Sequence, residues 1–208
     1  SNLDISYLAQ KDDLSLLING EEHIAIRCSK SGLNISECFN KVQELDDILS
    51  SVIPISYSKE FGYLTSNFQY YGCGIKIEIT MFLPALFSSG KIEDINQQIS
   101  KTNFKLVQKF NNAPIYILQN ISCHNISEDE LISKATNLAN EISEKEQKEQ
   151  VIQKSIGQIQ LKDTIYRSIG ISKYCYAISL DEAVKILCDL KYGIILGYLQ
   201  SDTERKSI

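Results

Sequence analysis

The 208-residue sequence predicts an α+β fold, in which helices cover an antiparallel β-sheet. Short runs with apolar residues at alternate positions, typical of half-buried strands, occupy the first part of the chain. From residue 127 onward the apolar residues recur instead at helical spacing. Because strands come first and helices last, the order favours an α+β arrangement over repeated βαβ units.

The first two expected strands, 14–18 and 22–28, flank the acidic turn Asn-Gly-Glu-Glu-His at 19–23. Asn-Gly favours a turn because both residues tolerate positive φ. We therefore expect Glu21 and Glu22 side by side at the tip of a hairpin. They are either part of a solvated turn or a site that holds a cationic guanidinium and accepts a proton.

Three further strands are expected at 75–81, 104–110 and 114–119, all joined to one antiparallel sheet. The strand at 75–81 has a clear inward and outward parity, with Lys76 on the outer face. The residues expected to be buried by this parity, here and after the acidic turn, are Ile24, Ile26, Ile75, Ile77 and Ile79.

Helices are expected where a capping residue precedes apolar residues at helical spacing. The N-terminal cap pairs are Asn34 with Glu37, Ser127 with Glu130, and Ser179 with Glu182; helices without such a pair are expected at 92–99 and 159–168, the latter stopping near Gly170. We divide the chain into an α+β domain at 1–154 and a C-terminal helical region at 155–208.

Composition excludes some functions and leaves others open. A net charge of −5 argues against a nucleic-acid partner, and no apolar run approaches the roughly 20 residues of a membrane helix. None of the six cysteines forms a C-x-x-C pair, which favours reduced thiols in the cytoplasm. With only two histidines, Cys123-His124 is not expected to bind a metal.

Several motifs, in this order, resemble those of the ATP:guanido phosphotransferase family, and within it the bacterial protein-arginine kinase branch. The turn at 19–23 resembles Asn-Glu-Glu-Asp-His, and residues 61–66 resemble Leu-Gly-Tyr-Leu-Thr-Ser. Gly-Cys-Gly at 72–74 and Leu-Pro-Ala-Leu at 83–86 resemble the family's Gly-Thr-Gly and Leu-Pro-Ala-Leu. Residues 165–171 and 192–197 resemble the branch's Arg-Ser-Leu-Gly-Ile and Arg-Gly-Ile-Asp-Leu-Gly stretches.

This resemblance implies a glutamine-synthetase-like catalytic fold and phosphoryl transfer from ATP, with Mg²⁺, to a guanidinium. It assigns Glu21 as the catalytic glutamate and Glu22 as the neighbouring acid. Lys76 and Arg27 remain as candidate nucleotide-binding residues. The resemblance also implies a protein substrate, or a partner kinase or adaptor, and a homodimer formed through residues near 155–199.

The departures from the family pattern concern phosphate binding. Ala25 and Lys76 stand where the family has arginines, and lysine lacks the bidentate fork of arginine. The Arg/Gly-rich loop between the last two strands is reduced to 111–113, and Asn67 replaces the cysteine after Leu-Thr-Ser.

Four readings remain open at this point: a weakly active kinase, a pseudokinase that acts through protein contacts, a fragment whose N-terminal part supplies the missing arginines, and a coincidental match.

Overall fold

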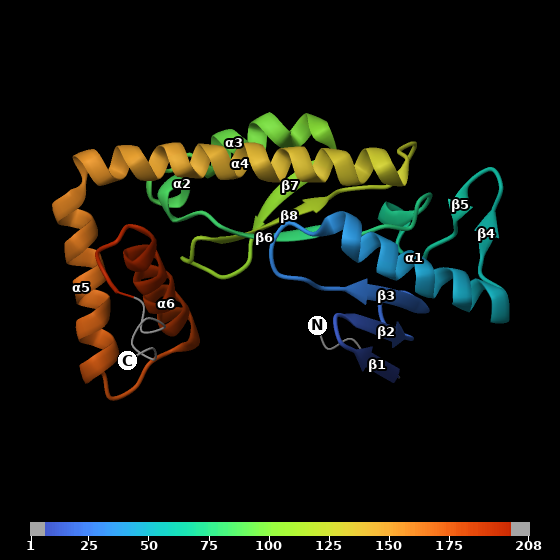
Figure 1. Cartoon of the computed structure of the whole chain (residues 1–208), viewed down its shortest axis with the longest axis horizontal. Helices are drawn as coiled ribbons and strands as arrows, with labels where there is room; N and C mark the ends of the chain where they lie inside the picture. Colours follow the sequence, from blue (N-terminus) through green and yellow to red (C-terminus); the bar gives the residue numbers. More distant parts are fainter. Residues whose placement is uncertain (1–6, 201–208) are drawn as a thin grey trace. The chain divides into compact units, whose positions relative to one another are not determined.

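The computed structural model describes residues 7–200, which form two compact units (Figure 1). Of these residues, 7–79, 102–104 and 119–138 belong to unit 1, and 80–101, 105–118 and 139–200 belong to unit 2. The fold is the expected mixture of helices and antiparallel sheet. No helix among residues 7–200 combines the length and apolarity that crossing a bilayer requires.

Unit 1 begins with a three-stranded antiparallel meander of β1 (Tyr7–Lys11), β2 (Leu14–Ile18) and β3 (Ile24–Cys28), drawn in dark blue in Figure 1. Helix α1 (Ile35–Val52) packs against β3. The sequence did not predict β1, because this edge strand is exposed on both faces and lacks an alternating apolar pattern.

The acidic turn joins β2 to β3 as expected. Asn19 adopts a φ of 54°, and its N–H donates to the His23 carbonyl oxygen at 2.9 Å. The expected burial of Ile24 is wrong, since 38% of its surface is exposed, and Ile26 is only half-buried. The strand register explains this result: Leu17, which is buried, lies opposite Ala25, so the other face of the hairpin points inward.

The remaining strands form two more sheets, so the expectation of one continuous sheet is wrong. Strands β4 (Tyr57–Ser58) and β5 (Gly62–Tyr63) pair with each other, and β6 (Glu78–Phe82), β7 (Phe104–Gln108) and β8 (Ile115–Asn120) form a sheet in the order β6-β8-β7. The parity of the 75–81 segment is confirmed: Ile77 is buried, Ile75 and Ile79 are half-buried, and Lys76 is exposed.

Strand β6 begins three residues later than expected because a side chain takes the place of a neighbouring strand. The Asn120 amide oxygen accepts from the Ile77 N–H at 2.8 Å, and its nitrogen donates to the Ile75 carbonyl oxygen at 3.0 Å. Asn120 is only 1% exposed, and these bonds satisfy the buried backbone groups without a ladder.

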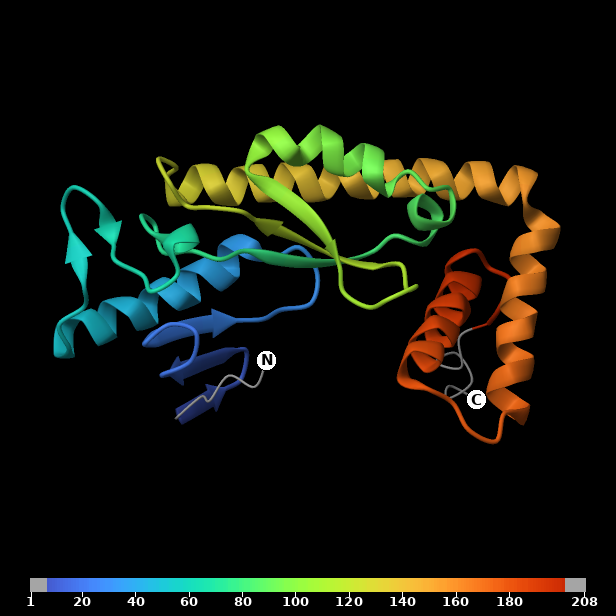
Figure 2. The same ribbon diagram turned by 180° about the vertical axis from the view of Figure 1, so that it is seen from behind.

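Helices α2 (Pro84–Ser88), α3 (Ile92–Ile99), α4 (Glu128–Ile156), α5 (Gln158–Tyr174) and α6 (Leu180–Ile195) follow in chain order. The Ser127 and Ser179 caps are confirmed, since their hydroxyl oxygens accept from the Glu130 and Glu182 N–H groups. Asn34 precedes α1 but forms no such bond. Figure 2 shows α5 and α6 side by side, as in Figure 1, and their contacts agree.

The expected stop near Gly170 is wrong, because α5 continues to Tyr174. No atom would lie within 4 Å of a side chain added at Gly170. A glycine inside a helix costs about 1 kcal/mol relative to alanine, which the packing of α5 against α6 offsets.

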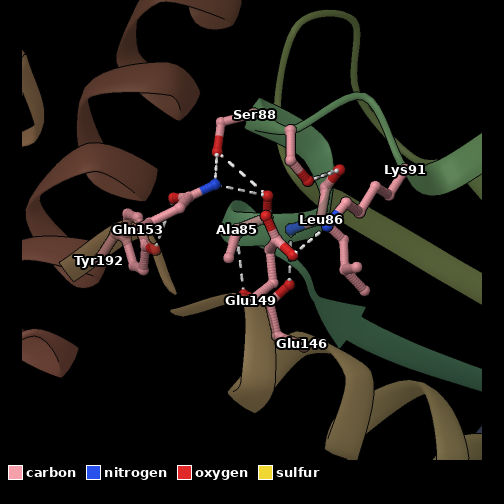
Figure 3. Close-up of polar contacts among 9 residues, drawn as sticks. Ala85, Leu86, Ser88, Lys91, Glu146, Glu149, Gln153 and Tyr192 are labelled. Atoms are coloured by element: carbon pink, nitrogen blue, oxygen red, sulfur yellow. Dashed lines mark hydrogen bonds and ion pairs between the residues drawn. The ribbon is translucent and has the colours of Figure 1, made fainter. Parts of the chain in front are cut away.

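In unit 2 a buried polar network joins α2, α4 and α6 (Figure 3). The Glu146 carboxylate of α4 is 4% exposed and accepts from the N–H groups of Ala85 and Leu86, both at 2.9 Å. About two turns further along α4, Gln153 donates to the Ala85 carbonyl oxygen and accepts from the Tyr192 hydroxyl at 3.1 Å. The network fixes the first turn of α2 to α4.

Candidate functional site

The acidic turn is held by hydrogen bonds from the segment that follows β5. The Ser66 N–H donates to Glu22 Oε2 at 2.6 Å, and the Asn67 N–H donates to Glu22 Oε1 at 2.8 Å. The Asn67 side-chain nitrogen donates to Glu21 Oε1 at 2.9 Å. Both Glu22 oxygens therefore bind backbone, whereas Glu21 is exposed and has one hydrogen-bond donor among the described residues.

The segment from Gly62 to Gly74 is folded back on itself, which positions these donors. Tyr63 and Gly72 pair through both backbone groups, with N–O distances of 2.8 and 3.2 Å. The Asn67 side-chain oxygen accepts from the Gln69 N–H at 3.0 Å and caps the short 3₁₀ helix Phe68–Tyr70. Asn67 therefore has two roles, because its oxygen caps the helix while its nitrogen holds Glu21.

Lys76 lies in the same part of unit 1. Its Nζ is 2.8 Å from Glu78 Oε1 and 5.9 Å from the centre of the Tyr70 ring. Burial by itself would lower the pKa of the Lys76 ammonium. The hydrogen bond and charge of Glu78, with smaller contributions from Tyr70 and Glu21, outweigh burial and raise this pKa. Tyr70 belongs to the 3₁₀ helix that Asn67 caps, so Lys76 lies near the segment that holds the acidic turn.

Arg27 is exposed on β3, opposite Ser15, and Ala25 lies between it and the turn. Strand β3 begins at Ile24, directly after the turn, and Arg27 lies three residues further on. At 3.3 Å per residue this is about 10 Å along the strand. Among residues 7–200, no hydrogen bond or ion pair joins Arg27 to Glu21 or Glu22. The structure therefore brings Lys76 near the acidic turn but does not bring Arg27 to it.

The charged side chains that the structure describes at this site are three carboxylates and one ammonium. Glu78 is paired with the Lys76 ammonium, Glu21 adds a smaller electrostatic influence on it, and Glu22 binds backbone N–H groups instead. Phosphate groups bind best to fixed positive charge, and an arginine guanidinium can donate hydrogen bonds to two phosphate oxygens at once. Carboxylate oxygens accept hydrogen bonds and attract cationic groups such as a guanidinium.

Aromatic side chains follow Asn67 in the segment that binds the acidic turn. The Phe68 ring stacks on Tyr71 with centroids 5.8 Å apart and contacts the His124 ring at 4.7 Å. His124 is therefore an aromatic packing partner of Phe68. Within the described part of the chain, no group of three or more His, Cys, Asp or Glu side chains could hold a metal ion.

Comparison with models of known protein families identifies the family of this chain. The family model described as ATP:guanido phosphotransferase, C-terminal catalytic domain, matches residues 4–149. The chain belongs to the ATP:guanido phosphotransferase family. A second model, protein-arginine kinase McsB C-terminal domain, matches residues 158–207.

Relatives within the ATP:guanido phosphotransferase family include two bacterial protein-arginine kinases. That of Clostridium perfringens is 32% identical over 98% of this chain and 65% of its own length. That of Caldanaerobacter subterraneus is 29% identical over 98% of this chain and 63% of its own length. The chain thus spans less than two thirds of these curated relatives.

Among solved structures, the substrate-free duplicated taurocyamine kinase from Schistosoma mansoni matches with a TM-score of 0.53 and 14% identity. It covers 65% of this chain, which covers 18% of that protein. At this identity the likeness shows a shared fold.

Sequence reasoning missed the donors that hold the family's acidic turn here. It treated Asn67 only as the replacement of a cysteine, and did not predict that its backbone and side chain bind both glutamates. An asparagine directly before Phe-Gln-Tyr was a usable signal, since asparagine caps short helical turns. The bond from the Ser66 N–H gave no signal, because it depends on a contact between residues 44 positions apart.

Glu22→Gln is expected to lower the free energy of unfolding by about 1 to 3 kcal/mol, because one carboxylate oxygen becomes an amide group that cannot accept a backbone N–H. Urea denaturation followed by circular dichroism measures the change. Glu21→Gln is the matched control and should cost less, since Glu21 is exposed and accepts only from Asn67 among the described residues. Equal losses in both variants would contradict a structural role specific to Glu22.

Proposed function

We propose that this chain is a cytoplasmic guanidinium-binding domain of the protein-arginine kinase type whose transfer of phosphoryl groups from ATP is weak or lost. The observation that carries the proposal is the charge of the site, where Lys76 is paired with Glu78 beside an acidic turn. A protein-arginine substrate is the acceptor that the relatives' names suggest. The division into 1–154 and 155–208 is part of the same proposal.

In this proposal Glu21 binds the guanidinium. Its exposed carboxylate can accept N–H bonds from a planar guanidinium and can take a proton from it. Asn67 holds Glu21 in place through its side-chain amide. Glu22 takes no part in binding, because both of its oxygens fix the segment that carries Asn67. No phosphoryl-transfer step is assigned, since the residues do not fit the triphosphate.

Mg-ATP is expected to bind more weakly than the micromolar range, because fixed positive charge is lacking and Lys76 is paired. Isothermal calorimetry measures this. A restoring variant that combines Ala25→Arg with Glu78→Gln should tighten binding at least tenfold. Affinity in the micromolar range for the unaltered chain, about −8 kcal/mol, would contradict the prediction.

A test of the reaction uses an arginine-rich protein, Mg-ATP and detection of acid-labile phosphate. We expect little or no phosphoarginine, and the amount should be the same in the Glu21→Gln variant. Robust phosphorylation that Glu21→Gln abolishes would instead assign an active kinase.

A second candidate function is a pseudokinase that acts through protein contacts, and exposed apolar side chains in the C-terminal helices favour it. In α6, Leu187 is 65% exposed and Ile195 is 48% exposed. Ile194 is also exposed, whereas Leu190 and Leu199 are partly buried. Apolar surface of this kind commonly marks a partner interface. We propose a second copy of this chain as the partner.

The chain is expected to form a dimer at micromolar concentration that Leu187→Glu weakens, because a charge would replace apolar contact area. Light scattering measures the mass. Lys173→Glu, at an exposed position of α5, is the control for a change of charge alone and should leave the dimer intact. A monomer at all concentrations would remove the basis for self-association.

A further inference from the structure

Two cysteines that are 50 positions apart in the sequence meet in unit 1. Cys73 lies between two glycines, and Cys123 follows β8. The Cys123 N–H donates to the Gln69 carbonyl oxygen at 2.9 Å. A Cβ atom added at Gly72 would lie 2.8 Å from the Cys123 carbonyl oxygen. The two backbone segments are therefore in contact directly beside both thiols.

The two thiols share one hydrogen-bond network. The Cys123 thiol donates to the Ile75 carbonyl oxygen at 2.8 Å, and it interacts with the Cys73 thiol closely enough to shift the pKa of both. The Asn120 amide also donates to the Cys123 sulfur at 3.6 Å. Cys123 is 1% exposed, whereas Cys73 is partly exposed, so a small solute in water reaches Cys73 first.

The environment favours the thiolate at Cys73 and disfavours it at Cys123. The hydrogen bond from Cys123 lowers the pKa of the Cys73 thiol, and a backbone hydrogen bond from Ile75 acts in the same direction, against burial and the charge of Glu128. The hydrogen bond to Cys73 and burial raise the pKa of the Cys123 thiol. The pair therefore combines an accessible nucleophile with a buried second thiol.

We propose that Cys73 and Cys123 are a peroxide-reactive pair that closes to an intramolecular disulfide. The Cys73 thiolate attacks one oxygen of hydrogen peroxide, the O–O bond breaks, and hydroxide leaves and becomes water. Cys73 is then a sulfenic acid. Cys123 attacks its sulfur, the S–S bond forms, and the S–O bond breaks with release of a second water. Two thiols are oxidised and one peroxide is reduced to two waters.

A second cysteine pair in the chain provides an internal comparison. Cys28 of β3 and Cys38 of α1 are hydrogen-bonded to each other, and both are partly exposed. Burial, followed by the contact with Cys28, raises the pKa of Cys38 to about 11, so Cys38 remains a thiol at neutral pH. If proximity alone decided reactivity, both cysteine pairs would oxidise at similar rates. We expect the Cys73 and Cys123 pair to oxidise faster.

The test treats the full chain with one equivalent of hydrogen peroxide at neutral pH, blocks the remaining thiols with an alkylating reagent, and maps the peptides by mass spectrometry. The expected product is a Cys73–Cys123 disulfide, about 2 Da lighter than the dithiol, formed at least tenfold faster than any link through Cys28 or Cys38. In Cys123→Ser, a sulfenic acid trapped by dimedone should accumulate at Cys73. Cys28→Ser should oxidise at the unaltered rate.

A second readout does not depend on trapping chemistry. Closing a loop of about 50 residues should raise the melting temperature by roughly 4 to 12 °C, and dithiothreitol should reverse the rise. A disulfide that forms first at Cys28–Cys38, or a full complement of thiols after peroxide treatment, would overturn the proposal. Neither readout involves ATP or a guanidinium, so the result is independent of the proposed function.

Discussion

Glu146→Ala is expected to lower the free energy of unfolding by about 3 to 5 kcal/mol, because it removes a buried carboxylate from two backbone donors. The N–H groups of Ala85 and Leu86 would lose their acceptor inside the core, where water cannot replace it. The Gln150 side chain, which donates to Glu146 Oε1 at 2.9 Å, would lose its partner as well. Figure 3 shows Ala85 and Leu86 of α2 beside the Glu146 side chain of α4.

Denaturant unfolding of the variant measures this loss, with Glu144→Ala as the matched control. Glu144 is exposed on the same helix, so its replacement should change stability by less than about 0.5 kcal/mol. Glu146→Gln keeps one acceptor oxygen and should fall between the two. A loss below about 1 kcal/mol in Glu146→Ala would show that α2 does not depend on this cap.

Gly62→Ala is expected to destabilise unit 1 by about 2 to 5 kcal/mol, since it combines backbone strain with a collision. Gly62 has a φ of 75°, a region that side chains disfavour. An added Cβ would lie 2.3 Å from the Gly72 carbonyl oxygen, the oxygen that accepts from the Tyr63 N–H. The pairing of Tyr63 with Gly72 would therefore have to open.

Gly90→Ala separates the two causes. Gly90 has a φ of 71°, but nothing lies within 4 Å of an added Cβ, so only the conformational cost of about 1 to 2 kcal/mol applies. Thermal unfolding of both variants gives the difference. If Gly62→Ala were no more destabilising than Gly90→Ala, the close approach of Gly62 to Gly72 would not contribute to stability.

Local patterns predicted the elements whose signals lie within a few residues. The helix at Ile92–Ile99 and the strand at Leu14–Ile18 have the expected bounds, and the cap of Ser179 on Glu182 is confirmed. In each case the periodicity or the capping pair lies inside the element itself. The errors arose where another part of the chain intervened, as when Asn120 replaced a strand partner for Ile77.

The site divides in the same way. The motifs at 19–23 and 61–66 indicated the family and the acidic turn without any coordinates. The sequence also showed that Ala25 and Lys76 replace arginines. The sequence did not show that the Glu78 carboxylate pairs with the Lys76 ammonium. Alternate residues of an extended segment share a face, but whether two opposite charges on that face pair depends on which other charged groups lie near them.

The amino-acid sequence by itself determined the α+β class, the family and the replacement of two family arginines by Ala25 and Lys76, because these depend on residue type and on spacing along the chain. The tertiary structure decided which side chains are already bound: Glu22 by Ser66 and Asn67, and Cys123 beside Cys73. A hydrogen bond between residues 44 or more positions apart has no local pattern, since its partners meet only after the intervening chain has folded.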